Sequence, residues 1–214
     1  MNIKTAIKKN YIFLIMHNTY DTQMIDFKEV IEKIDEAQKS TIMPLTEFRK
    51  KKSTSKLPTK SRGLYWLWCK TDFQSISFEP SKNGSAHVPL DVLINTRTGL
   101  EHICKEEHEG FVMVYNGMGG FKTWGKKSTY GLRARINQEC ISNNVKTGTL
   151  NIEARGFNRE DWMVSFFNFE DKKNDSILRL LDPDLNKDKI YEDLANTLEV
   201  LWRLHYGVPI FCRY

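Results

Sequence analysis

The residues of this chain best suited to chemistry surround a tyrosine at the end of an apolar run. In the segment GFVMVYNGMGGFKTW, residues 110–124, Tyr115 precedes a glycine-rich turn. Basic residues follow it along the chain: Lys122, Lys126, Lys127, Arg133 and Arg135. A phenol hydroxyl among cations suits phosphate binding, because both kinds of group donate hydrogen bonds to phosphate oxygens. The alternative is a hairpin in which Tyr115 only covers the core.

A second tyrosine, Tyr65, lies in GLYWLWC, and both tyrosines fall in segments with the composition of β-strands, 63–69 and 111–117. Side chains alternate along a strand, which predicts two sets of residues on common faces: Tyr65, Leu67 and Cys69; Phe111, Met113 and Tyr115. If the two strands pair antiparallel, the two phenols meet at one sheet edge. A helix predicted at 130–143, with its apolar stripe at Leu132, Ile136 and Cys140, then brings two arginines towards the same edge.

Further elements follow from hydrophobic periodicity and from capping residues. Apolar positions at helical spacing predict helices at 23–38 and 186–206, in addition to the one at 130–143. Two further strands are predicted at 148–155 and 162–169. Asp21 or Thr22 is expected to cap the helix at 23–38, and Asp182 or Asn186 is expected to cap the helix at 186–206. Gly207 and Pro209 are expected to end that last helix. This order of elements predicts a compact α+β fold with a small, mainly antiparallel sheet flanked by helices.

Two long stretches lack a strong periodic pattern. The segment EFRKKKSTSKLPTKSR, residues 47–62, holds one acidic residue and seven basic ones: Arg49, Lys50, Lys51, Lys52, Lys56, Lys60 and Arg62. This composition predicts a basic arm that contacts nucleic acid, the alternative being a solvated loop. Residues 70–109 are expected to form an insertion with one or two short strands. The predicted organisation is an N-terminal helical extension with the basic arm, 1–61, before a core at 62–214.

Composition narrows the class of protein. The chain has 214 residues, a formal net charge of +5, and no apolar run of the ~18–20 residues that span a bilayer. Its four cysteines form no CxxC pair and no disulfide framework, which indicates reduced thiols and a cytoplasmic protein. The mild basic excess permits a polyanionic partner. A zinc site at His102, Cys104 and His108 is a weaker alternative, because their spacing matches no common zinc motif.

Together these residues resemble the GIY-YIG nuclease family over roughly residues 62–212. Gly63-Leu64-Tyr65 is similar to the GIY element, and Tyr115-Asn116-Gly117 is similar to the YIG element. The segment GLRARINQE, beginning at Gly131, resembles the family helix in which a leucine precedes the phosphate-binding arginine by three residues, here Arg135. The segment LEVLWRLHYGVPIFC resembles the terminal helix and turn whose glutamate binds a metal, here Glu199.

The resemblance implies hydrolysis of a phosphodiester bond. Tyr65 would act as general base or activate the attacking water, and a phenol with a pKa near ~10 needs a nearby cation or metal for that task. Tyr115 would orient water or phosphate, and Arg135 would hold phosphate oxygens. Glu199 would hold one Mg²⁺ or Mn²⁺ ion in each active site. A related branch uses an assisting lysine before the arginine helix, a part that Lys127 is expected to play, with Lys122 and Lys126 as alternatives.

Several positions depart from the family pattern. The long separation of the two tyrosines requires residues 70–109 to be an insertion. Asn116 replaces an apolar residue, Glu139 stands where many members have an auxiliary histidine, and Cys212 lies where some members have an asparagine. Helical geometry alone makes Glu199 a surface residue, because it points away from the apolar stripe predicted for its helix: Ile190, Leu194, Leu198, Leu201 and Leu204.

The implied function is site-specific cleavage of double-stranded DNA, as by a type II restriction enzyme. Few residues follow Glu199, so target selection is expected from residues 1–61 and from the 70–109 insertion. One active site cuts one strand, which predicts a homodimer on a palindromic site. Lys122, Lys126 and Arg133 are expected to join the basic arm in contacting DNA. The alternatives are a non-catalytic nucleic-acid-binding module and a structure-specific or mobile-element nuclease.

Overall fold

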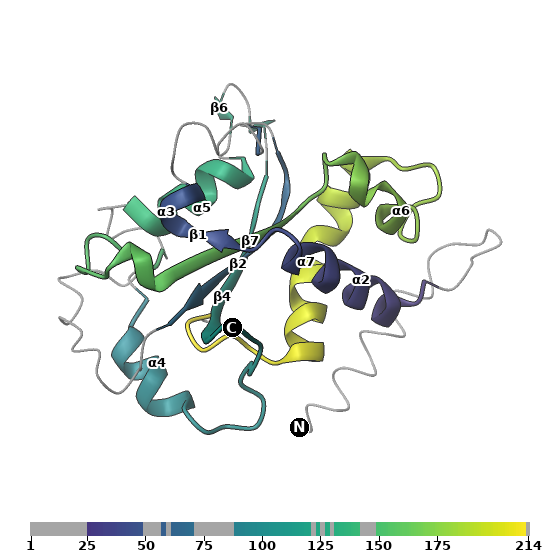
Figure 1. Cartoon of the computed structure of the whole chain (residues 1–214). Helices are drawn as coiled ribbons and strands as arrows, with labels where there is room; N and C mark the ends of the chain where they lie inside the picture. Colours follow the sequence, from purple (N-terminus) through teal and green to yellow (C-terminus); the bar gives the residue numbers. More distant parts are fainter. Residues whose placement is uncertain are drawn as a thin grey trace.

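An antiparallel β-sheet of five strands, with helices on both faces, forms the centre of the computed structural model (Figure 1). The strand order across the sheet is β1 (Met43–Pro44), β7 (Trp162–Asn168), β2 (Gly63–Cys69), β4 (Phe111–Gly119) and β3 (Glu107–His108). The structure describes residues 25–48, 57–58, 61–70, 88–120, 123–124, 127–128, 131–141 and 149–212. This architecture confirms the predicted α+β class with an antiparallel sheet flanked by helices.

β2 is the central strand, and all seven of its residues are buried. It pairs antiparallel with β4 on one side and with β7 on the other, along its whole length. A strand buried on both faces favours a continuous apolar run, which GLYWLWC supplies. Trp66 and Trp68 fill one face, and the other is filled by Tyr65, Leu67 and Cys69. The predicted strand at 63–69 and its pattern of shared faces are therefore confirmed.

Two helical layers cover the two faces of the sheet, each over its own hydrophobic core (Figure 1). The face of Trp66 packs against α2 (Phe27–Lys39), α6 (Asp175–Leu178) and α7 (Lys187–Tyr206). The face of Tyr65 packs against α3 (Leu45–Phe48), α4 (Leu90–Arg97) and α5 (Leu132–Ile141). The short elements are β5 (Thr123–Trp124), β6 (Lys127–Ser128), and the 3₁₀ turns η2 (Arg159–Asp161) and η3 (Lys172–Asn174).

α2 begins later than its apolar periodicity predicted. Asp26 caps the helix, because its carboxylate accepts hydrogen bonds from the backbone N–H groups of Lys28 (3.0 Å) and Glu29 (3.3 Å). The predicted caps, Asp21 and Thr22, are therefore wrong for this helix, and both lie outside the described residues.

α5 and α7 fall within their predicted spans. Asn186 caps α7 by accepting a hydrogen bond from the backbone N–H of Lys189 (3.1 Å). Gly207 follows the last turn with a φ of 96°, a conformation that favours glycine. The predicted apolar stripe of α5, Leu132, Ile136 and Cys140, is fully buried. The capping and stop signals read from the sequence are confirmed at these ends.

The buried face of α7 differs from the predicted leucine stripe. Leu204 is 56% exposed, whereas the buried residues are Ile190, Tyr191, Ala195, Leu198 and Trp202. The indole of Trp202 packs edge-on against Trp66, with ring centroids 5.7 Å apart, and this large contact turns that side of the helix towards the sheet. Glu199 therefore lies at the border of the buried face and not opposite to it.

β4 contains a β-bulge that changes which of its residues share a face. Its register with β2 skips Val114, the extra residue of the bulge. Before the bulge, Phe111 and Met113 face the tryptophan side of the sheet, but Tyr115 packs against the opposite core. The prediction that Phe111, Met113 and Tyr115 share one face is wrong, because strict alternation takes no account of a bulge. The same bulge puts Tyr115 on the face of Tyr65.

The predicted strand at 148–155 is wrong, because its described part forms turns. The backbone N–H of Ile152 donates to the carbonyl of Glu139 (3.0 Å), at the end of α5, and not to a neighbouring strand. Asn151 has a φ of 52°, which interrupts the extended conformation. Leu150 and Ile152 are fully buried, so the alternating apolar residues that suggested a strand instead pack this loop against α5.

The segment 70–109 is partly described. It contains one short strand, β3, which agrees with the prediction of one or two, but Leu90–Arg97 forms the helix α4, which was not predicted. Residues 71–87 lie outside the described residues. The basic arm lies outside them for the most part as well, so the division into an extension, an arm and a core stays a prediction.

The four cysteines carry free thiols and are buried. Burial raises the pKa of Cys104 to about 12 and that of Cys212 to about 11, so both are neutral thiols at neutral pH. Cys69 and Cys140 lie in the core on the face of Tyr65. Across the described ranges, no helix combines the length and the apolar composition needed to cross a membrane.

Asp35 is a buried carboxylate that ties α2 to α7. It accepts hydrogen bonds from Trp202 Nε1 (3.1 Å) and from Gln38 Nε2 (3.0 Å), and it pairs with Lys39 Nζ (2.7 Å). Buried polar groups are stable only when they are paired in this way. The interaction therefore helps to set the position of α7, which carries Glu199.

The substitution Asp35→Ala is expected to lower the free energy of unfolding by about 2–4 kcal/mol, because the buried indole N–H of Trp202 loses its acceptor. Asp35→Asn is the matched control, since its amide oxygen still accepts that hydrogen bond, and it should lower the stability less. Urea denaturation followed by tryptophan fluorescence measures both changes. Equal stability of Asp35→Ala and the unaltered protein would contradict the assigned role.

Candidate active site

The two tyrosines lie side by side on one face of the sheet. Tyr65 on β2 stands opposite Gly117 of β4, and Tyr115 stands opposite Leu67, two positions away. Their ring centroids are 6.1 Å apart. Tyr65 is fully buried, whereas Tyr115 is partly exposed at the rim of the same core. Antiparallel pairing, together with the bulge, therefore brings the two phenols to one place.

Two glycines of β4 make room for this arrangement. A Cβ added at Gly117 would lie 2.7 Å from the hydroxyl oxygen of Tyr65, and one at Gly119 would lie 2.6 Å from the Cα of Leu132. Neither position tolerates a side chain without movement, since both distances are well below normal van der Waals contact. Gly117 thus lets the phenol lie against β4, and Gly119 lets α5 pack directly on the strand. These glycines serve close approach within a strand, which continues past Tyr115 to Gly119, so no turn directly follows Tyr115.

Glu139, at the end of α5, organises the site. Its side chain is 0% exposed. One carboxylate oxygen accepts a hydrogen bond from the Tyr65 hydroxyl (2.8 Å) and lies 3.3 Å from Nη2 of Arg135. The other oxygen accepts a hydrogen bond from the backbone N–H of Leu150 (2.7 Å). A carboxylate buried this deeply is tolerated only when it is paired and hydrogen-bonded, and both conditions hold here.

Burial dominates the proton affinities of this cluster. Desolvation raises the pKa of Glu139 above its ordinary value, although Arg135 and the hydrogen bonds act in the opposite direction. Desolvation and the negative charge of Glu139 also raise the pKa of Tyr65 and that of Tyr115. Tyr65 is therefore a neutral phenol at neutral pH, and it donates its proton in a hydrogen bond to a carboxylate that is more basic than an exposed one.

Arg135 is the guanidinium nearest to both phenols. Burial lowers its pKa, but interactions with Tyr65, Glu139 and Tyr115 outweigh this effect and leave the pKa raised. Its side chain is 29% exposed, and Nη1 donates to Oε1 of Gln138 (3.2 Å). Arg135 therefore stays charged, is held by Glu139 from the buried side, and still presents part of its surface to solvent.

Glu199 lies on α7 and is linked to β4 through Arg203. Its carboxylate pairs with Arg203, one helical turn further on, and the two side chains are only 13% and 15% exposed. Arg203 in turn donates from Nε to the side-chain oxygen of Asn116 (2.7 Å) and from Nη2 to its backbone carbonyl (3.3 Å). Cys212 closes the group, with Sγ 3.2 Å from the same side-chain oxygen of Asn116. α7 is thereby attached to β4 at the residue next to Tyr115.

Electrostatic interactions connect Glu199 with the rest of the site. Burial raises the pKa of Glu199, and the positive charges of Arg203 and Arg135 act against this rise. The charge of Glu199 contributes in turn to the raised pKa of Tyr115. Of the four residues that the family resemblance singled out, Tyr65, Tyr115 and Arg135 lie on one face of the sheet. Glu199 comes from α7 on the other face and is linked through Arg203 to Asn116, the residue next to Tyr115. The roles of all four stay predictions.

Of the residues predicted to contact DNA, Arg62 is the most fully described. Its guanidinium pairs with Glu170 (2.6 Å) and with Asp188, and it lies over the ring of Tyr191. Arg133 is partly exposed on α5, and Lys127 lies on β6. The other predicted contacts lie outside the described residues: Arg49, Lys50, Lys51, Lys52, Lys56, Lys60, Lys122 and Lys126.

Sequence reasoning noted Glu139, Asn116 and Cys212 only as departures from the family pattern, and it missed Arg203. The structure places all four in contact with the predicted site or directly beside it. A signal was available in the i, i+4 spacing of opposite charges, Arg135 with Glu139 and Glu199 with Arg203, because such residues lie on one side of a helix. A lone asparagine in the apolar strand FVMVYNG was a second signal.

Clusters of three or more histidine, cysteine or acidic side chains that could hold a metal ion are absent from the described residues. Cys104 is buried in the core, and the ring of His108 packs edge-on against Trp68 at 6.3 Å between centroids. Zinc binding by His102, Cys104 and His108 has no support in this arrangement. A cation at Glu199 would depend on other ligands, such as water and phosphate oxygens.

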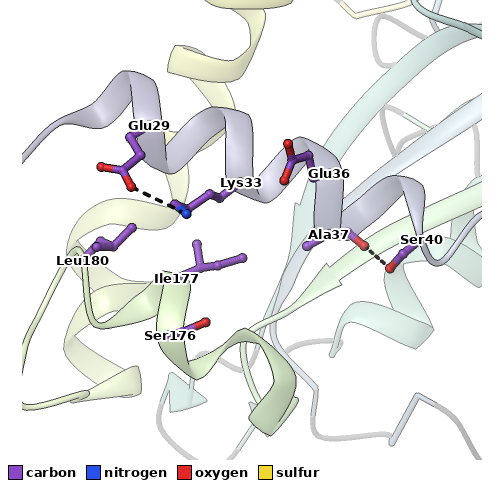
Figure 2. Close-up of a pocket in the computed structure, with 8 residues that line it drawn as sticks. All are labelled: Glu29, Lys33, Glu36, Ala37, Ser40, Ser176, Ile177 and Leu180. Carbon is purple, nitrogen blue, oxygen red and sulfur yellow. Dashed lines mark hydrogen bonds and ion pairs between the residues drawn. The ribbon is translucent and has the colours of Figure 1, made fainter.

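A surface pocket of about 430 Å³ lies away from this site, between α2 and α6 (Figure 2). Its lining residues are Glu29, Lys33, Glu36, Ala37, Ser40, Ser176, Ile177 and Leu180. Glu29 and Lys33 form an ion pair on α2 along one wall (3.6 Å). The pocket belongs to the helical layer on the tryptophan face, so it is remote from the phenols.

Comparisons of the sequence with protein-family models, with curated proteins and with solved structures find no match. The interpretation of the site therefore rests on its own geometry and chemistry, together with the resemblance of the motifs.

The raised pKa of Glu139 predicts a pH-dependent contribution to stability. An acid whose pKa is higher in the folded state than in the unfolded state stabilises the fold fully below its unfolded pKa, here 4.5, and this contribution is lost as the pH rises through the folded pKa. Glu139→Gln cannot titrate. The free energy of unfolding of this variant, relative to that of the unaltered protein, should therefore increase as the pH rises above about 4.5.

Urea denaturation at a series of pH values measures this difference. Glu192→Gln is the matched control, because it removes the same charge from an exposed position of α7. If the difference between Glu139→Gln and the unaltered protein stays constant over this range, Glu139 is not an ionisable group with a raised pKa.

Proposed function

We propose that this chain is a metal-dependent endonuclease of the GIY-YIG type. The observation that carries the proposal is the clustering of two phenols and a guanidinium from β2, β4 and α5 on one face of the sheet, with the Glu199 carboxylate of α7 linked to β4 next to Tyr115. These elements follow one another in the order that the resemblance implied. Phosphodiester hydrolysis needs a proton acceptor for water, a cation for the phosphate oxygens and a site for a divalent ion, and the cluster offers each of them.

Arg135 is the proposed ligand of the scissile phosphate. Its planar guanidinium matches two phosphate oxygens, and its exposed side lies next to the partly exposed ring of Tyr115. Glu139 holds the guanidinium from the buried side, so a phosphate is met by a group that is already oriented. Tyr115 donates its hydroxyl proton to the same phosphate or to the attacking water.

Tyr65 and Glu139 form the proposed proton path. The attacking water, entering beside Tyr115, gives a proton to the Tyr65 hydroxyl as that hydroxyl passes its own proton to Glu139 along the 2.8 Å hydrogen bond. The oxygen of the water forms a bond to phosphorus, the bond to the 3′ oxygen breaks, and the 3′ oxygen takes a proton from solvent. The relay avoids net ionisation of Tyr65, which burial disfavours.

Glu199 is the proposed ligand of one Mg²⁺ or Mn²⁺ ion. Proteins commonly hold Mg²⁺ through one or two carboxylates together with water and substrate phosphate oxygens, so a single acidic side chain beside a phosphate site fits this ion. Such an ion stabilises negative charge on the phosphate and on the leaving oxygen. The electrostatic interaction of Glu199 with Arg135 supports its place beside the proposed phosphate.

The proposed substrate is double-stranded DNA, cut at a defined site by a homodimer, as by a type II restriction enzyme. The basic residues of the arm at 49–62 supply contacts to the DNA backbone, which predicts salt-dependent binding. Arg62 would contribute by exchanging Glu170 and Asp188 for a phosphate. Each active site cuts one strand, so two copies complete a double-strand break.

A non-catalytic nucleic-acid-binding module is the second candidate. It is favoured by the complete burial of Tyr65 and by the existing ion pair of Glu199 with Arg203. Both features are also those of side chains that only stabilise the fold. The two candidates share DNA binding and differ in hydrolysis.

Incubation of the purified chain with phage DNA is expected to give discrete fragments with Mg²⁺ and none with EDTA. The fragment pattern on a gel and sequencing of the fragment ends measure this outcome. A random smear would replace the restriction-type proposal with a non-specific nuclease, and cutting of branched DNA alone would indicate a structure-specific one. Bound but intact DNA in a mobility-shift assay would favour the second candidate.

Single substitutions test the proposed roles. Tyr65→Phe and Glu139→Gln should each slow single-turnover cleavage by about 10²–10⁴-fold, because each breaks the same proton path. The double substitution should slow it little further, since residues that act as one unit are not additive. Glu199→Ala should abolish cleavage and leave DNA binding largely intact.

Tyr206→Phe is the matched control for loss of a phenol hydroxyl, because Tyr206 packs against Trp202 on the other side of the sheet. Circular dichroism verifies that each variant is folded. Cleavage by folded Glu199→Ala at the unaltered rate would remove the proposed metal ligand from the mechanism.

A further inference from the structure

We propose that Arg203 closes Glu199 to divalent cations until DNA is bound, so that metal and DNA bind cooperatively. The inference rests on the proposed function, because it concerns the regulation of the same carboxylate. It is carried by the contacts of Arg203 with Glu199 and with Asn116, the residue next to Tyr115.

Arg203 is held in place by Asn116 as well as by Glu199. Two hydrogen bonds, from Nε and Nη2, attach its guanidinium to the side chain and the backbone carbonyl of Asn116. Asn116 is itself buried in β4 and is held by Cys212. The guanidinium therefore cannot follow Glu199 if that side chain turns towards solvent. Arg203 is a fixed positive charge at the carboxylate that a cation would need.

The charge balance of the site supports the same conclusion. Among the described residues, four charged side chains lie beside Tyr115 or its neighbour Asn116: Arg135, Glu139, and the ion pair of Glu199 with Arg203. Two positive and two negative charges sum to zero, so the cluster offers no net negative potential to attract a divalent cation. The low exposure of Glu199 and Arg203 strengthens their attraction, since buried charges are screened less than exposed ones.

A DNA phosphate changes this balance. When it binds at Arg135, it adds a negative charge and further oxygen ligands beside Glu199, and a cation can then compete with Arg203. Thermodynamic linkage requires the converse, that the cation tightens the binding of DNA by the same factor. This coupling would keep the site without a metal until a substrate is present.

Titration of the full chain with Mn²⁺, followed by electron paramagnetic resonance without DNA, tests the closure directly. Arg203→Gln removes the charge and keeps an amide donor for Asn116, so it should bind Mn²⁺ at least about tenfold more tightly than the unaltered chain, about 1.4 kcal/mol. Arg203→Lys keeps the charge and should remain within about threefold. The double variant Glu199→Gln with Arg203→Gln should lose the gain.

Equal affinity of Arg203→Gln and the unaltered chain, or an equal gain in Arg203→Lys, would overturn the closure and leave the proposed function standing. A gain that survives in the double variant would show that Glu199 is not the ligand, which removes the metal assignment of the proposed function as well. A purely structural Arg203 would change thermal stability without changing the affinity for Mn²⁺.

The unaltered chain provides a second test that does not depend on the folding of any Arg203 variant. Filter binding with a phage DNA fragment that the protein cleaves in Mg²⁺ is carried out with Ca²⁺ and with EDTA. Ca²⁺ should tighten DNA binding at least about tenfold, and Glu199→Gln should abolish this effect. Binding of the same strength with and without Ca²⁺ would refute the coupling.

Discussion

The hydrogen bond between Tyr65 and Glu139 is the interaction on which the candidate site depends. Glu139 is completely buried, and its two oxygens have partners from β2, from α5 itself and from the loop at Leu150. Loss of any of these partners would leave part of a charge unsatisfied in a medium of low dielectric constant. The central strand, the arginine helix and the following loop are thus held together by one carboxylate, and Arg135 takes its orientation from it.

A second polar network attaches α7 to the other side of the site. It is built on Asn116, a residue next to Tyr115, and it reaches Glu199 through Arg203. The two networks approach the exposed part of β4 from opposite faces of the sheet. Tyr115 and Arg135 are partly exposed beside these networks. Buried charges next to partly exposed polar groups distinguish this region from a packed core and make it a candidate for chemistry.

Local patterns were sufficient for much of the fold. Continuous apolar sequence predicted β2, and capping residues predicted the ends of α7, because these features depend on neighbours along the chain. The loop at 149–155 and the helix α4 were not predicted, because their conformations depend on contacts with residues elsewhere in the chain. The alternating apolar residues of the loop are buried by packing on α5. The backbone N–H groups of Leu150 and Ile152 donate to the side chain and to the carbonyl of Glu139 on that helix, and no pattern within the loop predicts these partners.

Sequence by itself determined the class of fold and most of its main elements, and it predicted four candidate residues for the site. Tertiary structure decided where these side chains lie and which residues they contact. The bulge at Val114 turns Tyr115 to the face of Tyr65, and the packing of Trp202 turns Glu199 towards β4. Both are non-local effects, since each depends on the fit of one element against another, and no periodicity within a single segment encodes that fit.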